Sequence, residues 1–265
     1  LTGSQATTNI IYYYSKSTGN LDQLSTWGTN VNGTGTSPIS FSAPNSYYFV
    51  VNNSSPTLGS NLIITGGNTA LSVGDGVNSF NLTIPAGITL TTDTFLLKKN
   101  STLTINGALA GLNNFFEDSS TAQYLGSTSQ NIPTGNYYNL ITSSSTKTLN
   151  NGNILVRNAF TMMSSVNLNN YSLMIGSSTS QVGTLNYVSG VVYGGNMYRW
   201  FTTATNTGTS GLFPIGTATT YRPVQINYTT APTTGGSLAV AFNSNVPSNN
   251  GLPQIDITTT PIISV

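Results

Sequence analysis

The chain has 265 residues, 37% of them hydrophobic and 5% charged, with a formal net charge of +1. This length and apolar content allow a sizeable buried core and exclude a disordered chain. Seven Lys and Arg residues are too few for a basic surface that binds nucleic acid or anionic membranes. The chain has no His and no Cys, which excludes His-dependent catalytic triads, thiol nucleophiles, disulfides and zinc or iron–sulfur sites.

Short apolar runs rich in Val, Ile, Tyr, Phe and Thr alternate with Gly, Asn, Ser and Pro, and no stretch shows helical periodicity. This pattern is typical of an all-β protein. Residues 1–40 precede its regular part and are expected to form an N-terminal capping segment. No apolar run approaches the roughly 18 residues that a membrane-spanning helix needs. Leu1 to Gln5 lack the basic region and long apolar core of a signal peptide.

From Tyr47 onward the apolar runs return at a nearly constant step. Successive runs place an apolar residue at equivalent positions: Leu62, Leu82, Leu103, Ala122 and Leu140. These positions lie 20, 21, 19 and 18 residues apart. A step of about 20 residues with two or three short strands predicts a β-solenoid, whose coils bury a shared core by stacking. We place this parallel β-helix over residues 41–190 and expect it to be right-handed, as parallel crossovers generally are.

Strand alternation predicts which side chains face inward in these coils. Four of them are expected to form a stacked internal ladder: Leu82, Ile84, Leu103 and Ile105. The intervening Thr83 and Thr104 then face solvent. Ice-binding solenoids carry outward rows of Thr, but the positions one coil away are expected to be Ile63 and Gln123, so the row is too short to favour ice binding.

Asn precedes the apolar residue in five of the runs: Asn61, Asn81, Asn139, Asn153 and Asn167. Asn tolerates the left-handed backbone conformation that a corner needs, and its side-chain amide can bond to a neighbouring coil. We interpret these residues as corner residues. The alternative is that an Asn-rich chain produces such pairs by chance.

The pattern changes after about residue 190. The segments 224–228 and 237–242 alternate well and are joined by a stretch that contains Pro and Gly. They predict a hairpin in a small antiparallel β-sandwich-like module, which we place over residues 191–265. The chain stops at Val265 within a strand-like stretch, which suggests a piece of a longer polypeptide.

Several stretches resemble secreted and cell-surface proteins of Bacteroidota bacteria. They are YYYSKSTGNLDQLSTWGTNVNGTG (12–35), AQYLGSTSQNIPTGNYYNLITSSSTKTL (122–149), NILVRNAFTMMSSVNLNNYSLMIG (153–176) and LFPIGTATTYRPVQINYTTAPTTGG (212–236). The resemblance implies a β-helical stalk or adhesin within a large modular protein, often exported by type IX secretion, and it implies no single activity. The C-terminal sorting domain typical of type IX cargo is not found in this sequence.

The chain has few acidic residues that could carry chemistry: Asp22, Asp75, Asp93, Glu117, Asp118 and Asp256. A glycosidase needs two carboxylates about 5 to 10 Å apart. Asp75 and Asp93 lie about one coil apart and could stack, but both occupy expected turns, where Asp makes local hydrogen bonds. Glu117 and Asp118 lack the several spaced oxygen ligands of a calcium loop. We therefore predict no catalytic residue, no cofactor and no metal site, and we expect Lys98 and Lys99 to be solvated.

The 14 Tyr residues dominate the aromatic side chains. Exposed aromatic rings stack on the apolar faces of sugars and are common at interfaces, although strand alternation is expected to bury at least every second one. Four residues are the candidates for surface contacts: Tyr47, Tyr137, Tyr198 and Trp200.

These observations predict an extracellular or outer-surface structural or adhesive module that is not an enzyme. Its expected partners are glycans, other cell-surface components or copies of itself, with no nucleic acid and no membrane insertion. Two alternatives remain open. A missing cap at either end would favour a self-assembling surface filament, in which open strand edges pair between chains. A groove lined by carboxylates and aromatic rings would favour a carbohydrate-binding or carbohydrate-cleaving β-helix.

Overall fold

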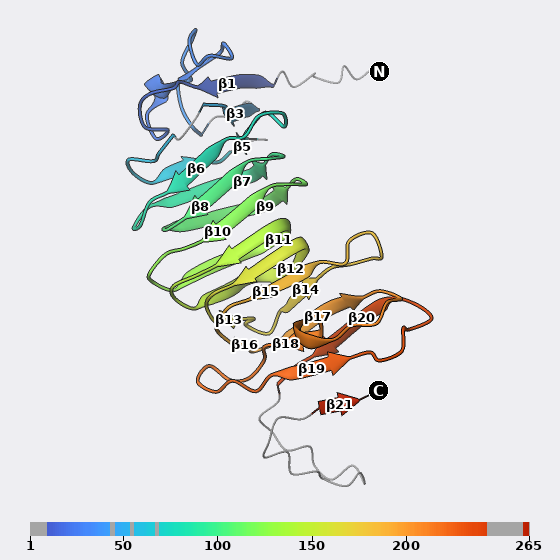
Figure 1. The fold of residues 1–265 in the computed structure, drawn as a ribbon. Helices are drawn as coiled ribbons and strands as arrows, with labels where there is room; N and C mark the ends of the chain where they lie inside the picture. The colour runs from blue at the N-terminus through green and yellow to red at the C-terminus, as the bar shows by residue number, and fades with distance from the viewer. Residues whose placement is uncertain (1–9, 43–45, 54–55, 67–68, 243–261, 265) are drawn as a thin grey trace, which may run out of the picture.

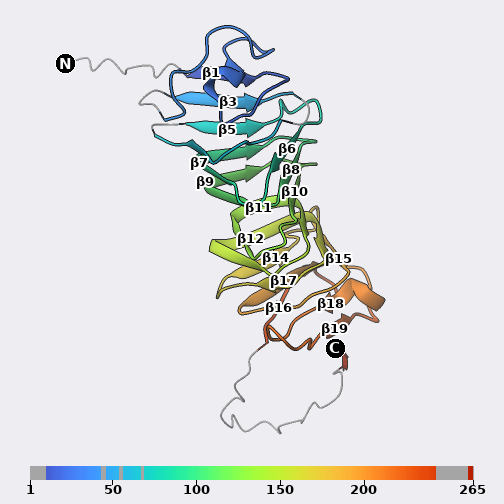
Figure 2. The ribbon, with the colours of Figure 1, turned by 90° about the vertical axis from the view of Figure 1, so that its left-hand side faces the viewer.

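The computed structural model describes residues 10–42, 46–53, 56–66, 69–242 and 262–264. It confirms an all-β protein built on a parallel β-solenoid of about seven turns. The coils stack along the long axis of the molecule, from β1 near one end to β17 and β20 near the other (Figures 1 and 2). Within these ranges the helices are two 3₁₀ turns, η1 (Leu24–Thr26) and η2 (Gly208–Gly211), and no helix is long and apolar enough to span a membrane. The right-handed winding of the solenoid stays a prediction.

Each coil contributes strands to three faces, and each strand pairs in parallel with the strand of the next coil. Four long strands turn the corners between faces: β7 (Thr89–Leu97), β9 (Ala108–Phe116), β11 (Gln130–Thr142) and β12 (Lys147–Met162). Face 1 consists of β1 (Ile11–Ser15), β3 (Tyr47–Val51), β5 (Ala70–Val73), β14 (Ser172–Ile175), β17 (Asn196–Phe201) and the segments 94–97, 113–116, 135–137 and 154–156. Face 2 consists of β4 (Leu62–Ile64), β13 (Val166–Asn167), β16 (Val192–Tyr193) and the segments 89–92, 108–111, 130–133 and 147–150. Face 3 consists of β6 (Asn81–Ile84), β8 (Thr102–Ile105), β10 (Thr121–Tyr124), β15 (Thr184–Tyr187) and the segments 139–142 and 159–162.

Face 3 carries the predicted internal ladder. Leu82 pairs in register with Leu103, and Ile84 pairs with Ile105, and all four side chains are fully buried. The Leu82 column continues through the later coils with Ala122, Leu140, Phe160 and Leu185. Each coil therefore covers the apolar side of the next, as the periodicity predicts.

Two details of the predicted stacking are wrong. Leu62 lies on face 2 above Leu90, one full coil later, and does not stack on Leu82. The step of 20 residues from Leu62 crosses only part of a coil, because β5 and a long turn follow β4 before β6 begins. In the later coil Ile141 faces outward, and Thr142 takes the inward position two residues after Leu140.

The Asn residues connect coils as predicted, but without the predicted conformation. The Asn61 Oδ1 atom accepts a hydrogen bond from the Thr89 N–H at 2.8 Å, and the Asn153 Oδ1 atom accepts one from the Ser172 N–H at 2.8 Å. None of the five predicted corner residues has a positive φ. Among the described non-glycine residues, the positive φ angles belong to Asn100, Ser119, Ser144, Asn151, Asn169 and Asn170. The amides of Asn61, Asn139 and Asn153 therefore act between coils, whereas Asn167 Oδ1 accepts locally from the Asn169 N–H at 3.0 Å.

A cap closes the N-terminal end of the solenoid. Strand β1 pairs with β3 along one edge, and strand β2 (Trp27–Gly28) pairs antiparallel with its other edge and covers it. Trp27 and Leu21 are fully buried, and the Trp27 Nε1–H donates to the Leu21 carbonyl at 2.8 Å. Strand β1 itself is the first rung of face 1, so the solenoid begins within the segment predicted as a cap.

The C-terminal end contains a small antiparallel sheet, as predicted, but its extent and its strand pairing differ from the predicted module. Parallel pairing continues past residue 190, with β16 on β13 and β17 on β14. A small sheet follows, formed by β18 (Leu212–Phe213), β19 (Val224–Asn227) and β21 (Ile262–Ser264). The predicted hairpin is wrong, because β20 (Gly236–Val240) pairs antiparallel with β17 and not with β19. This pairing supplies hydrogen bonds to the last edge of face 1 and brings Leu238 and Val240 against the core.

Candidate functional site

On face 1, one register column of side chains is mostly apolar, and its members from Leu96 onward are partly or largely exposed, whereas Val50 and Ser72 are buried. The positions that share one register are Tyr14, Val50, Ser72, Leu96, Phe115, Asn136, Leu155, Met174 and Tyr198. We call this set the outer column of face 1. The matching outward positions of face 3 are mostly polar: Thr83, Thr104, Gln123, Ile141, Thr161 and Asn186. The two faces thus share a backbone pattern and present different chemistry to solvent.

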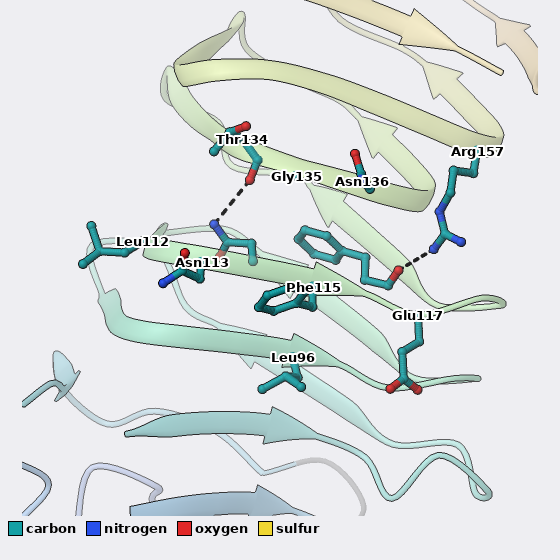
Figure 3. Close-up of a pocket in the computed structure, with 11 residues that line it drawn as sticks. Leu96, Leu112, Asn113, Phe115, Glu117, Thr134, Gly135, Asn136 and Arg157 are labelled. Carbon is teal, nitrogen blue, oxygen red and sulfur yellow. Dashed lines mark hydrogen bonds between the residues drawn. The ribbon is translucent and has the colours of Figure 1, made fainter. Parts of the chain in front are cut away.

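A cleft of about 660 Å³ opens beside the outer column, where β9 meets β11 (Figure 3). Strands β7 and β9 pair over four residues on this face, but β9 and β11 share one in-register pair, Phe115 with Asn136. Next to this pair, Gly135 leaves room for the Phe116 ring. A Cβ atom on Gly135 would lie 2.9 Å from Phe116 Cε2, and that ring is stacked on Tyr137 with centroids 4.0 Å apart.

The walls of the cleft combine exposed apolar side chains with amides. Phe115 is 56% exposed and Leu112 is 71% exposed, and Phe115 lies directly beside Leu96 of the neighbouring rung. Figure 3 shows these three residues with Asn113 and Asn136 along the same opening. The sequence shows the run Phe115–Phe116 but not which ring faces out.

Two buried polar atoms of this region have no partner within the described part of the chain: Asn114 Oδ1 and Arg157 Nε. The Asn114 Nδ2 group is bonded, since it donates to the Gly111 carbonyl at 3.0 Å and to the Thr134 carbonyl at 3.4 Å. The cleft therefore has one acceptor and one donor left over, and a buried polar atom without a partner costs about 1–3 kcal/mol.

The charged groups around the cleft are paired with one another. Arg157 forms an ion pair with Asp118, donates to the Phe116 carbonyl and lies over the Tyr138 ring at 5.5 Å. Lys98 and Glu117 form a second ion pair at 2.6 Å. Burial lowers the pKa of Lys98, but its hydrogen bond to Glu117 and the interactions with Tyr48 and Glu117 outweigh burial and raise it. The cleft thus carries no unpaired charge from these four groups.

Asp75 and Asp93 do not meet. Asp75 lies in the turn after β5, where it accepts hydrogen bonds from the N–H groups of Val77 and Asn78, each at 2.8 Å. Its slight burial raises its pKa, but these donors outweigh burial and lower it. Asp93 lies at the opposite end of the neighbouring rung of face 1, just before the segment 94–97, where it accepts from the Gly66 N–H at 2.8 Å. About six residues of extended chain separate the two corners, or roughly 20 Å.

Two of the four candidate contact residues are wrong. Tyr47 is 3% exposed and Tyr137 is fully buried, because both lie on the inward side of their strands. Tyr198 and Trp200 are partly buried and face outward on β17. A contact role for these last two stays a prediction.

The row of outward Thr residues is slightly longer than predicted. Thr83 is preceded by Thr57, through an isolated bridge, and not by Ile63, which lies on face 2. Gln123 follows Thr104 as predicted. The row ends after three threonines, so it does not form an extended hydroxyl array.

Two cations are buried in the described part of the chain: Lys147 and Arg199. Lys147 is fully buried and donates to the Gly126 carbonyl at 3.0 Å and to Ser145 Oγ at 3.1 Å, and burial lowers its pKa to about 8. The Arg199 guanidinium lies over the rings of Phe201 and Phe213, at 6.0 and 5.9 Å from their centroids, and burial lowers its pKa to about 10. Lys147 lies two residues before the buried Leu149 on β12, so strand alternation places both side chains on the inward side. This spacing is the sequence signal that could have predicted the burial of Lys147.

No group of three or more acidic residues that could hold a metal ion occurs in the ranges that the structure describes. The sequence matches no protein-family model, no curated protein and no solved structure. The function proposed below therefore depends on the geometry of this chain.

Proposed function

We propose that the chain is a non-catalytic structural and adhesive module of a secreted or cell-surface protein, with face 1 as its adhesive surface. The observation that carries the proposal is the outer column of face 1, where seven of the nine side chains that share one register are apolar or aromatic and those from Leu96 onward are at least partly exposed. Contiguous exposed apolar surface is typical of interaction sites. Aromatic side chains and Met are also enriched at interfaces.

The solenoid suits a load-bearing or spacing role. Stacked coils share one continuous core, so each coil is held by its neighbours and the length of the module follows from the number of coils. The covered edge of β1 and the burial of Trp27 do not favour the filament alternative at the N-terminal end, because an open edge is what would pair with another chain.

The chemistry of the surface favours uncharged partners. The chain has 13 charged residues, seven basic and six acidic, and the four around the cleft neutralise one another. Glu117 is the one carboxylate that lines the cleft, and Lys98 and the Lys99 N–H engage it. Carbohydrate cleavage generally uses a pair of carboxylates, so this site favours binding.

The proposal can be tested by changing face 1 without changing the core. In one variant Leu155, Met174 and Tyr198 are all replaced by Ser. The matched control replaces Ile141, Thr161 and Asn186 on face 3 by Ser. We expect the first variant to lose attachment to polysaccharide-coated surfaces and the control to keep it, with both remaining folded by circular dichroism. Equal attachment by the two variants would show that face 1 is not the adhesive surface.

A further inference from the structure

We infer that the cleft between β9 and β11 is a binding subsite for an uncharged glycan chain. This inference depends on the proposed function, since it names the class of partner that face 1 binds. It places the contact at one rung of the solenoid and makes the rest of the outer column a flanking surface.

The apolar wall fits the ring faces of sugars. A pyranose ring presents C–H groups on its faces, which pack on aromatic and alkyl side chains and lose contact with water. Phe115 and Leu112 are the two most exposed apolar side chains at this rung, and Leu96 extends the surface to the next coil. Such side chains are costly to expose unless they serve a contact.

The polar wall fits sugar hydroxyls. A hydroxyl group both donates and accepts hydrogen bonds. The unpaired Asn114 Oδ1 needs a donor, and the unpaired Arg157 Nε–H needs an acceptor. A sugar hydroxyl can supply either one, and the exposed amides of Asn113 and Asn136 supply further donors and acceptors along the opening.

The electrostatics favour a neutral chain over an acidic one. Arg157 is engaged by Asp118 and the Phe116 carbonyl, so it presents no free guanidinium fork to a carboxylate. Lys98 is likewise engaged by Glu117, so neither of these cations is free to attract a uronate. The volume of about 660 Å³ lies within the range of small-molecule sites and leaves room for more than a single small group.

The test uses the whole chain and defined sugars. The probes are hexasaccharides of β-1,4-glucose, β-1,4-mannose and β-1,3-glucose, with α-1,4-galacturonic acid hexasaccharide as the charged control. Binding is measured by titration calorimetry and by saturation-transfer NMR, up to about 1 mM sugar, where even weak binding of about −4 kcal/mol is visible. We expect at least one neutral hexasaccharide to bind and the galacturonate to bind more weakly.

Two variants assign the binding to the cleft. Phe115→Ala removes the exposed ring and is expected to weaken binding about tenfold or more, as central aromatic contacts commonly do. Thr104→Ala changes an outward position on face 3, away from the outer column, and is expected to leave binding unchanged. Asn136→Ala provides a second cleft variant that does not depend on the ring, and thermal unfolding shows whether each variant is folded.

The outcomes separate this inference from the proposed function. If no neutral hexasaccharide binds while the protein still attaches to surfaces through face 1, the subsite is refuted and the adhesive role stands. If Phe115→Ala and Thr104→Ala weaken binding equally, the cleft is not the site. If the galacturonate binds more tightly than every neutral probe, the assignment to an uncharged chain is overturned.

Discussion

Faces 1 and 3 of the solenoid have the same architecture and opposite exteriors. Both are parallel ladders whose inward columns are largely apolar and buried. On face 3 the outward amides bond along the ladder, with Asn139 Nδ2 donating to Thr121 Oγ1 at 3.3 Å and Asn186 Nδ2 donating to Thr161 Oγ1 at 3.4 Å. On face 1 the outer column consists mostly of rings and alkyl groups, which form no such hydrogen bonds, with Ser72 and Asn136 as its polar members. The inward residues therefore specify the fold, and the outward residues are free to specify a function.

The largest effect should come from an inward position of face 3. Leu103→Ala removes a fully buried side chain from the internal ladder. We expect the free energy of unfolding to fall by about 2–5 kcal/mol, because the coils above and below hold the cavity open. Thr104→Ala, one residue later and facing outward, should change it by less than about 0.5 kcal/mol. Urea denaturation of both variants measures the contrast, and equal losses would contradict the assignment of inward and outward positions.

A second test concerns the break in face 1. Gly135→Ala places a Cβ atom against the Phe116 ring, which the stack on Tyr137 prevents from moving away. We expect a loss of about 1–3 kcal/mol, typical of overpacking. Gly87→Ala is not a suitable control, because Gly87 has a φ of 77°. Ser129→Ala, at an exposed position just before β11, is the control and should leave the thermal unfolding temperature nearly unchanged. If Gly135→Ala is also unaffected, the Phe116–Tyr137 stack is loose.

Lys147 breaks the rule that inward residues are apolar, and its titration should be visible in stability. Its pKa is about 8 in the folded chain, and its pKa is near 10.5 when unfolded. Between these values the unfolded state holds the proton and the folded state does not, so stability rises with pH by up to about 1.4 kcal/mol per pH unit. Above about pH 10 the buried Tyr124 and Tyr137, whose pKa values burial raises, should reverse the trend.

The variant Lys147→Met isolates this effect. It keeps a long side chain in the same space and removes the titrating group. We expect its free energy of unfolding, measured in urea between pH 8 and about pH 9.5, to be nearly flat while that of the natural chain rises. Parallel pH profiles would mean that Lys147 is solvated.

The smallest expected effect is that of salt on adhesion. Rings and uncharged amides are not screened, whereas the range of charge interactions falls from about 10 Å at 0.1 M salt to about 3 Å at 1 M. Attachment to polysaccharide-coated surfaces should change by less than about tenfold over this range. A larger loss would show that the ion-paired groups near the cleft, beginning with Lys98, carry the contact.

The sequence alone was sufficient for the all-β class, the solenoid and the inward ladder from Leu82 to Ile105. Alternation and a repeat of about 20 residues are local properties, and every coil must bury the same apolar side. The sequence could not tell which face a run lies on, because coils of unequal length move equivalent residues to different faces, as Leu62 shows by stacking on Leu90.

Only the tertiary structure decided which aromatic side chains are exposed and where the cleft forms. In the sequence, Tyr137 and Phe115 are each the first residue of a pair of adjacent aromatic residues. In the structure, Tyr137 is fully buried and Phe115 is 56% exposed. Arg157 and Asp118 are 39 residues apart in the sequence. They form an ion pair because two full turns of the solenoid return the chain to the same face of the stack. The outward chemistry of a solenoid is thus set by register between coils, a non-local property that the repeat does not encode.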